Sequence, residues 1–226
     1  MKNFVIAIDG PAGAGKSTIA KLVAERLGFL YIDTGAMYRA LTLKALKKNL
    51  PLDDRKKLIE MAKNTDLKLI QKNKKLHVIV DGEDVSEEIR SEEVSRNTHY
   101  IASIPEIREI LWDMQRKYRE THNIVMEGRD IGSKVFPDAQ LKIYLDASVD
   151  ERAKRRYLQL KEKGIDVDFE EIKKEVMERD KKDKNRKIAP LVKLPDAVYI
   201  DTTNMTIEEE VETIIKLYRE REFKSG

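Results

Sequence analysis

The sequence of 226 residues has no cysteine, only six prolines and one tryptophan. Without thiols the chain forms no disulfide and no thiolate metal site, which fits a reducing compartment, and we expect a cytoplasmic protein. Long apolar runs are missing too. The run at residues 4–8 is far shorter than a signal-peptide core and leads straight into a glycine-rich stretch, so we read it as a strand and expect no membrane partner.

A dominant sign of charge is also missing, because 44 Lys and Arg stand against 41 Asp and Glu, for a net charge of +3. That excess is too small to argue for nucleic acid as a partner, and we expect none. Hydrophobic residues make up 41% of the chain and charged residues 38%, a balance that predicts one folded domain with a heavily charged surface. Since no long exposed apolar stripe demands a partner, we expect a monomer.

Five short apolar segments end in polar or glycine-containing turns, as buried strands do. They are residues 4–8, 29–32, 124–126, 141–145 and 197–200. Helical patterns fall between them, one of them behind a Thr206/Glu209 capping box, and this alternation predicts a parallel sheet covered on both faces. Residues 67–70, 76–80 and 85 are β-like instead, and Asp81-Gly82 predicts a tight hairpin turn. We therefore expect a small antiparallel insertion.

A glycine-rich stretch joins the first expected strand to an amphipathic helix over residues 18–27. It consists of Gly10, Pro11, Ala12, Gly13, Ala14, Gly15, Lys16 and Ser17, followed by Thr18. This is the phosphate-binding loop pattern in its required context, where Lys16 reaches the β- and γ-phosphates and Ser17 can ligate Mg²⁺. The loop predicts a bound nucleoside triphosphate. It does not separate a kinase from an ATPase, a GTPase or a motor.

The residues that follow the other strands are candidates for the acceptor, because ligands bind beyond the carboxyl ends of strands in open α/β sheets. Thr34 and Arg39 follow the second strand, where a helix start and a fixed charge can bind an anion. For this segment alone, a capped helix with a surface arginine is the simpler interpretation. Arg129 and Asp130 follow the third strand. The guanidinium of Arg129 can hold a phosphate through two parallel hydrogen bonds, and Asp130 can accept a hydrogen bond or act as an indirect magnesium ligand. An ion pair at the strand end is an equally plausible interpretation.

A densely charged tract near the C-terminus contains Arg179, Asp183 and Arg186 at positions i, i+4 and i+7. A helix that continues through all three would place them on one face. Asp168 and Glu171 predict the capped start of that helix. A run of charges is more often a solvated face, so this pattern is only suggestive by itself.

In combination these segments resemble the bacterial cytidylate kinase family of P-loop nucleoside monophosphate kinases. The loop, DTGAMYR (33–39), Arg108, GRDIGSKVFPDA (128–139) and ERDKKDKNRKIAPL (178–191) occur in that family's order and approximate spacing over essentially the whole chain. The resemblance implies a three-layer α/β/α fold with a central five-stranded parallel sheet, a small antiparallel β insertion and a helical lid. Within a single domain of residues 1–226, the core would comprise about 1–33, 113–149 and 188–226, the monophosphate-binding region about 34–112, and the lid about 150–187.

The resemblance also implies a reaction and a set of site residues. The reaction is transfer of the γ-phosphoryl group of ATP, bound with Mg²⁺, to CMP or dCMP, which yields ADP and CDP or dCDP. Catalysis would rest on Lys16, Arg129, Asp130 and Arg186. The acceptor's α-phosphate would be gripped by Thr34, Arg39, Arg129 and Arg186, its ribose by Arg179 and Asp183, and its base by Arg108 and Asp130, with Tyr38 in the same site. Arg155 would contact ATP, and the lid arginines would be Arg152, Arg155 and Arg156.

Pairing an arginine with an aspartate makes physical sense for cytosine. The N4 amino group donates to a carboxylate, whereas N3 and O2 accept from a guanidinium. Uracil reverses this polarity and would leave buried charges mispaired. One position departs from the family, which commonly has a serine nine residues before the base-reading arginine. Here that position is His99, with Ser95 and Ser103 nearby, and His99 is more often a surface or structural side chain than a base reader.

Three other functions stay open at this point. A kinase for UMP, AMP or shikimate would share the loop, and base preference would separate it. A GTP-dependent switch is poorly supported, because the chain has no evident Asn-Lys-x-Asp guanine-reading motif. A nucleic-acid module built on residues 150–187 is weakened by the acidic residues among the basic ones.

Overall fold

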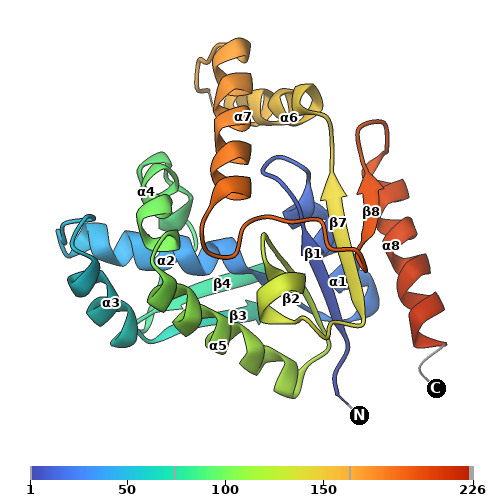
Figure 1. Cartoon of the computed structure of the whole chain (residues 1–226), viewed down its shortest axis with the longest axis horizontal. Helices are drawn as coiled ribbons and strands as arrows, with labels where there is room; N and C mark the ends of the chain where they lie inside the picture. The colour runs from blue at the N-terminus through green and yellow to red at the C-terminus, as the bar shows by residue number, and fades with distance from the viewer. Residues whose placement is uncertain (1, 74, 163, 224–226) are drawn as a thin grey trace.

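A computed structural model describes residues 2–73, 75–162 and 164–223. Positions 1 and 224–226 of the expected core, position 74 of the expected monophosphate-binding region and position 163 of the expected lid lie outside the described residues. The strands β1 (Val5–Asp9), β2 (Leu30–Asp33), β6 (Ile124–Gly128), β7 (Leu141–Asp146) and β8 (Val198–Asp201) form one parallel sheet in the order β2-β6-β1-β7-β8 (Figure 1). The five expected strands and the α/β fold with its central parallel sheet are therefore confirmed, with boundaries that differ by one or two residues.

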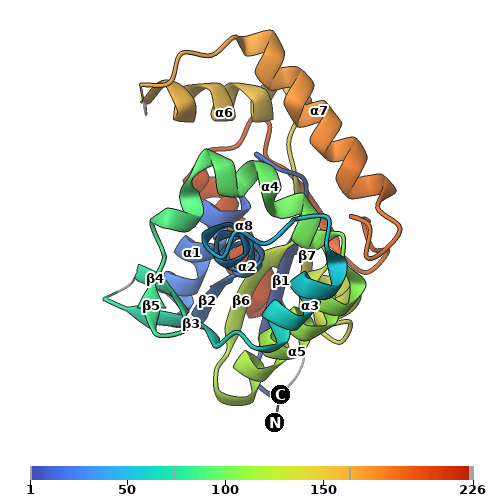
Figure 2. The same ribbon diagram turned by 90° about the vertical axis from the view of Figure 1, so that its left-hand side faces the viewer.

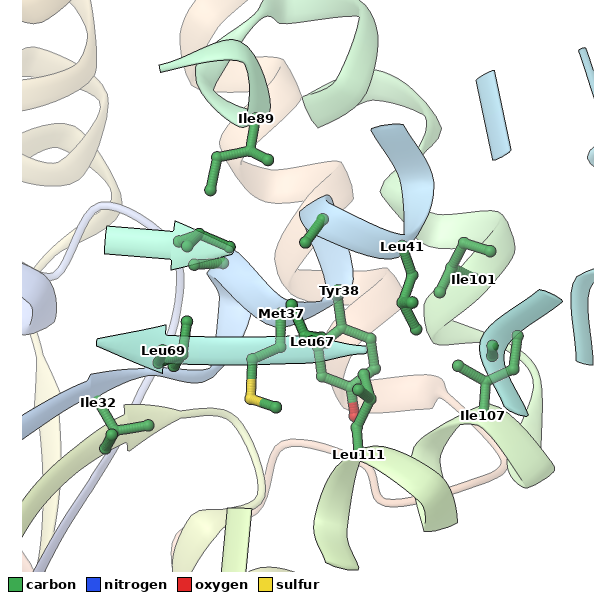
Figure 3. Packing of buried hydrophobic residues seen from close by; sticks show 14 of the residues in the cluster. Ile32, Met37, Tyr38, Leu41, Leu67, Leu69, Ile89, Ile101, Ile107 and Leu111 are labelled. Carbon is green, nitrogen blue, oxygen red and sulfur yellow. The ribbon is translucent and has the colours of Figure 1, made fainter. Parts of the chain in front are cut away.

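Helices cover both faces of this sheet because successive strand residues point to opposite sides. Ile6 and Ile8 of β1 pack with α1 (Lys16–Leu27) and α8 (Ile207–Glu222), whereas Val5 and Ala7 pack with α2 (Thr34–Lys47) and α5 (Pro105–Thr121). The second core also takes in α3 (Arg55–Lys63), the turn η1 (Glu88–Arg90) and α4 (Glu92–Ala102). Figure 3 shows Tyr38 reaching from α2 toward Leu111 of α5 inside this core.

The expected capping box at the start of α8 is present, since the Thr206 hydroxyl accepts the Glu209 N–H and the Glu209 carboxylate accepts the Thr206 N–H. Among the described residues, no helix combines the length and the apolar character needed to cross a membrane.

The expected antiparallel insertion is a sheet of β3 (Leu67–Lys72), β4 (Lys75–Val80) and β5 (Glu83–Asp84). Its second turn is Asp81-Gly82, as predicted, and both residues adopt the left-handed conformation that a two-residue hairpin requires. The buried Leu67, Leu69, Val78 and Val80 join the same core as α2, and Figure 3 shows Leu67 and Leu69 in this cluster with Met37 of α2. The insertion is thus packed onto the helix that carries part of the candidate acceptor site.

The charged tract folds as two helices, α6 (Val149–Glu162) and α7 (Phe169–Asn185), which project beyond the carboxyl ends of the strands (Figures 1 and 2). Asp168 caps α7 by accepting the Glu171 N–H, as expected. The helix does not continue through Arg186, because α7 ends at Asn185 and Arg186 is extended. In a continued helix, the ring of Pro190 would clash with the carbonyl group of Arg186, four residues earlier, and proline has no N–H to bond it.

Candidate active site

The glycine-rich loop follows β1 and lies against the end of β7. Gly10 has a φ of 154°, and a Cβ there would sit 2.0 Å from the Leu145 carbonyl oxygen, so only glycine fits. Gly13 and Gly15 also have positive φ, and Gly15 leads directly into α1. The expected phosphate-binding loop therefore has the strand, turn and helix that its sequence predicts.

Lys16 opens α1 and its side chain is buried in this loop. Its Nζ donates to the Pro11 carbonyl oxygen at 2.6 Å. Burial, and next the charge of the nearby Arg129, lower the pKa of Lys16 to about 7. A cation held among other cations is stabilised when a polyanion binds, because the anion offsets the repulsion. The positive charges around the loop therefore favour the binding of phosphate.

Glu127, at the end of β6, is a functional candidate that the sequence reading missed. Its carboxylate accepts hydrogen bonds from the Ser17 hydroxyl and from Tyr31 Oη, the latter at 3.4 Å. Burial, with Asp33 close by, raises the pKa of Glu127. A hydroxyl and a carboxylate beside a phosphate loop are the oxygen ligands that Mg²⁺ prefers, so these residues fit the ion. The signal that would have found Glu127 is its place at a strand end immediately before Gly128.

Asp9 is a second buried carboxylate that the sequence reading missed. Its two oxygens accept the N–H groups of Ile131 and Gly132 at 2.9 and 2.8 Å. These amides open the short π-helical turn η2 (Ile131–Val135), directly after Asp130. Burial raises the pKa of Asp9 to about 6 despite these two hydrogen bonds. Asp9 thus links the end of β1 by hydrogen bonds to the segment that contains Arg129 and Asp130.

The start of α2 is capped by Asp33, whose carboxylate accepts the Ala36 N–H and also pairs with Arg39 at 2.8 Å. Thr34 is buried and donates to the Glu127 carbonyl oxygen at 2.8 Å. The helix start is thus held by an internal carboxylate, as the simpler interpretation of this segment expects. Thr34 and Arg39 nevertheless lie at the carboxyl edge of the sheet, beside the end of β6.

Arg129 and Asp183 join the sheet edge to α7. Arg129 Nε donates to Asp183 Oδ2 at 2.8 Å. Burial opposes ionisation of this carboxyl, but Arg129, followed by Arg179 and Arg186, lowers the pKa of Asp183. Arg179 is exposed on α7 one turn before Asp183, and its charge also acts on Lys16. The loop lysine and these α7 residues therefore face one another across the site.

Arg108 of α5 and Asp130 form an ion pair at 2.6 Å, with side chains only 2% and 6% exposed. Arg108 also lies over the rings of Tyr38 and Trp112, with its Cζ 5.1 and 5.6 Å from their centroids. Two buried polar atoms here, Arg108 Nε and Tyr38 Oη, have no hydrogen-bond partner within the part of the chain that the structure describes. Unsatisfied donors of this kind are costly, and they mark a place where a polar ligand would bind.

Arg186 lies close to this pair although it is outside α7. Its guanidinium donates to the carbonyl oxygens of Ile188 and Ala189. Burial, and next the like charge of Arg108, lower the pKa of Arg186. Tyr38 and Asp130 also act on its charge. The structure thus brings Tyr38, Arg108, Asp130 and Arg186 together, as the resemblance implies.

His99 is not part of this cluster. It is exposed on α4, where its Nδ1 bonds to the Arg96 carbonyl oxygen at 2.9 Å and its ring lies beside Tyr100. Ser103 donates to the Tyr100 carbonyl oxygen, and Ser95 is exposed on the same helix. The interpretation of His99 as a surface side chain is therefore confirmed.

The three expected lid arginines differ in their surroundings. Arg152 is buried and donates to both carboxylate oxygens of Asp180, at 2.9 and 2.6 Å. This bidentate ion pair joins α6 to α7. Arg155 donates to the carbonyl oxygens of Ala14 and Thr202, against the phosphate loop. Arg156 is half-buried on α6 and bonds to Gln159. Arg152 and Arg155 therefore both contact the phosphate loop, because Arg152 Nη1 also donates to the Ala12 carbonyl oxygen at 3.1 Å.

Comparisons with known proteins point to one family. A family model described as "Cytidylate kinase" matches residues 6–220. A "Cytidylate kinase" from Alkaliphilus oremlandii is 55% identical over 97% of this chain and 99% of its own. One from Caldanaerobacter subterraneus subsp. tengcongensis is 52% identical over 95% and 94%. Among solved structures, a gluconokinase from Sinorhizobium meliloti shares the fold, at a TM-score of 0.50 and 14% identity over 99% of this chain and 98% of its own.

Proposed function

We infer the reaction from the premise that this chain belongs to the cytidylate kinase family. It transfers the γ-phosphoryl group of ATP to CMP or dCMP and releases ADP with CDP or dCDP. The chain is a phosphotransferase, and its relatives match it over nearly their full length. The residue roles that follow are proposals about how this site performs that reaction.

The observation that carries the proposal is the buried Arg108–Asp130 pair beside unpartnered polar atoms. Both hydrogen bonds to this carboxylate reach Oδ2, one from Arg108 and one from Trp112. We propose that Oδ1 accepts the N4 amino group of cytosine and that Arg108 Nε donates toward N3 or O2. Uracil would present O4 to the carboxylate and an N–H to the guanidinium. The pair therefore favours CMP over UMP.

The acceptor's α-phosphate is proposed to bind between Arg39, Arg129 and Arg186, with the Thr34 hydroxyl at its edge. Support comes from their shared position at the carboxyl edge of the sheet, and from the burial and the like charge of Arg108 that together lower the pKa of Arg186. Two parallel hydrogen bonds from an arginine suit phosphate oxygens, and Arg39 and Arg129 would exchange their carboxylate partners, Asp33 and Asp183, for phosphate. Arg179 and Asp183 on the facing helix are proposed to hold the ribose hydroxyls.

On the donor side, Lys16 and the backbone N–H groups of residues 10–18 are proposed to hold the β- and γ-phosphates, with Arg155 closing against the loop. Ser17 and Glu127 are the residues that would hold Mg²⁺, which neutralises phosphate charge when bound. The site needs no general base, because phosphoryl transfer depends mainly on positioning and charge stabilisation. The residues of the site would align the acceptor phosphate with the γ-phosphorus and exclude water.

Residues 150–187 are proposed to act as the lid that excludes this water. The Arg152–Asp180 pair would make α6 and α7 move as one unit, since breaking a buried pair is costly. We also propose that the enzyme works as a monomer in the cytoplasm. These two statements rest on composition and on the lack of a long apolar stripe in the sequence.

The test is ADP release from Mg-ATP with CMP, dCMP, UMP, AMP, GMP or shikimate as acceptor. Fast turnover with CMP and dCMP alone is the expected result. Turnover with another acceptor instead would keep the kinase and overturn the base-reading proposal. Slow ATP hydrolysis with no acceptor dependence would favour a nucleotide switch.

A further inference from the structure

The single tryptophan of the chain stands one helical turn after Arg108 on α5 and touches the proposed base site. Its indole Nε1 donates to Asp130 Oδ2 at 2.9 Å, and Arg108 Nη2 donates to the same oxygen at 2.6 Å. Two donors on one carboxylate oxygen fix the rotation of the carboxyl group, because turning it would break both bonds. The other oxygen is thereby held in one direction.

The ring of Trp112 adds a second restraint on the same pair. Arg108 Cζ lies 5.6 Å from the Trp112 ring centroid and 5.1 Å from that of Tyr38, so the guanidinium is stacked between two aromatic side chains. A second hydrogen bond of this guanidinium, from Arg108 Nη1 to the Ala102 carbonyl oxygen at 2.9 Å, further restrains its orientation. Trp112 thus contacts both members of the pair, one through its N–H and one through its face.

We propose that Trp112 is a specificity-determining residue that positions Asp130 to accept the amino group of the acceptor base. This inference rests on the proposed function, because it assumes that Asp130 reads the base. Trp112 itself is assigned no contact with the reacting phosphates. Its effect is to hold the carboxylate oxygen that faces the base in one direction as a hydrogen-bond acceptor. A fixed acceptor favours binding of a base that presents an amino group over one that presents a carbonyl oxygen.

The test compares the wild type with Trp112→Phe on two acceptors, CMP and the CMP analogue that carries hydrogen in place of the 4-amino group. Phenylalanine keeps an aromatic ring for Arg108 and removes the N–H together with the second ring of the indole. We expect the ratio of kcat/KM for CMP to kcat/KM for the analogue to fall about tenfold in W112F, the size of one hydrogen bond to a charged group. An equal loss on both acceptors, or no loss, would overturn the proposal.

A matched control lies on the same helix. Tyr118 follows Trp112 by six residues on α5 and accepts a hydrogen bond from the Leu69 N–H of β3 at 2.8 Å. Tyr118→Phe also removes one aromatic hydrogen-bonding group from α5, and it should leave the ratio unchanged. If the wild type phosphorylates no cytidine nucleotide, the proposed function fails. If it does so and W112F keeps the full ratio, only this inference fails.

A second measurement needs no variant. Because Trp112 is the single tryptophan, the intrinsic fluorescence of the wild type reports on its indole. CMP should change this emission with half-saturation at the concentration that half-saturates turnover, and ATP alone should change it little. An emission that stays constant while CMP saturates the enzyme would contradict contact between Trp112 and the base-reading carboxylate.

Discussion

Removal of the Asp130 carboxylate tests how far the candidate site depends on one buried charge pair. In Asp130→Ala, Arg108 would stay buried with only the Ala102 carbonyl oxygen and two aromatic rings around it. Its side chain is 2% exposed, so water cannot replace the lost carboxylate without local opening. Breaking a buried pair from one side typically costs about 3–5 kcal/mol, and we expect that loss in the free energy of unfolding.

Urea unfolding followed by Trp112 fluorescence and by far-UV circular dichroism measures this loss. The two signals should change together if unfolding is two-state. The double variant Arg108→Met with Asp130→Ala should be less destabilised than the two single changes predict together, because the unpaired charge is gone. Glu106→Ala is the control, since it breaks the exposed Arg55–Glu106 pair at the start of the same helix, and it should change stability little. Equal small effects of D130A and E106A would refute the reasoning.

Three further changes test other parts of the site. Glu127→Gln should raise the Mg²⁺ concentration needed for half-maximal turnover several-fold, and an unchanged Mg²⁺ titration would remove Glu127 from the metal site. Asp9 has a raised pKa of about 6 against 3.8, so protonation favours the folded state. Stability of the wild type relative to Asp9→Asn should therefore rise by about 2 kcal/mol between pH 7 and pH 4 in urea unfolding, and a constant difference would contradict this. Asp180→Asn should speed amide hydrogen exchange in α6 but not in β1, whereas equal exchange in both proteins would show that the Arg152 pair does not hold the lid.

Local sequence patterns were sufficient for the parts of the fold that are set by near neighbours. The Thr206/Glu209 box and the Asp81-Gly82 turn formed where they were expected, because each is specified by two to four consecutive residues. The parallel sheet followed from apolar segments separated by helices. The helices α3 and α4 were not predicted. Ser91, which caps α4, was the available signal for the second of them.

The site was predictable where a residue has a motif and not where it acts through distant contacts. Lys16 and Arg129 stand inside recognisable segments. Glu127 and Asp9 depend on partners more than 100 positions away, namely Ser17 for the first and the amides of the η2 turn for the second. The spacing of Arg179, Asp183 and Arg186 allowed a helix through all three, but spacing alone did not fix where α7 ends, which is at Asn185. Pairings across the chain therefore needed the fold.

The central claim is that the Arg108–Asp130 pair selects a cytosine acceptor for the phosphoryl group. The most direct test gives the wild-type enzyme equimolar CMP and UMP in one reaction with limiting Mg-ATP and separates the products. The ratio of CDP to UDP is then the ratio of the two kcat/KM values. We predict a ratio of at least about one hundred, the size expected when a buried pair is mispaired. Comparable amounts of CDP and UDP would contradict the claim.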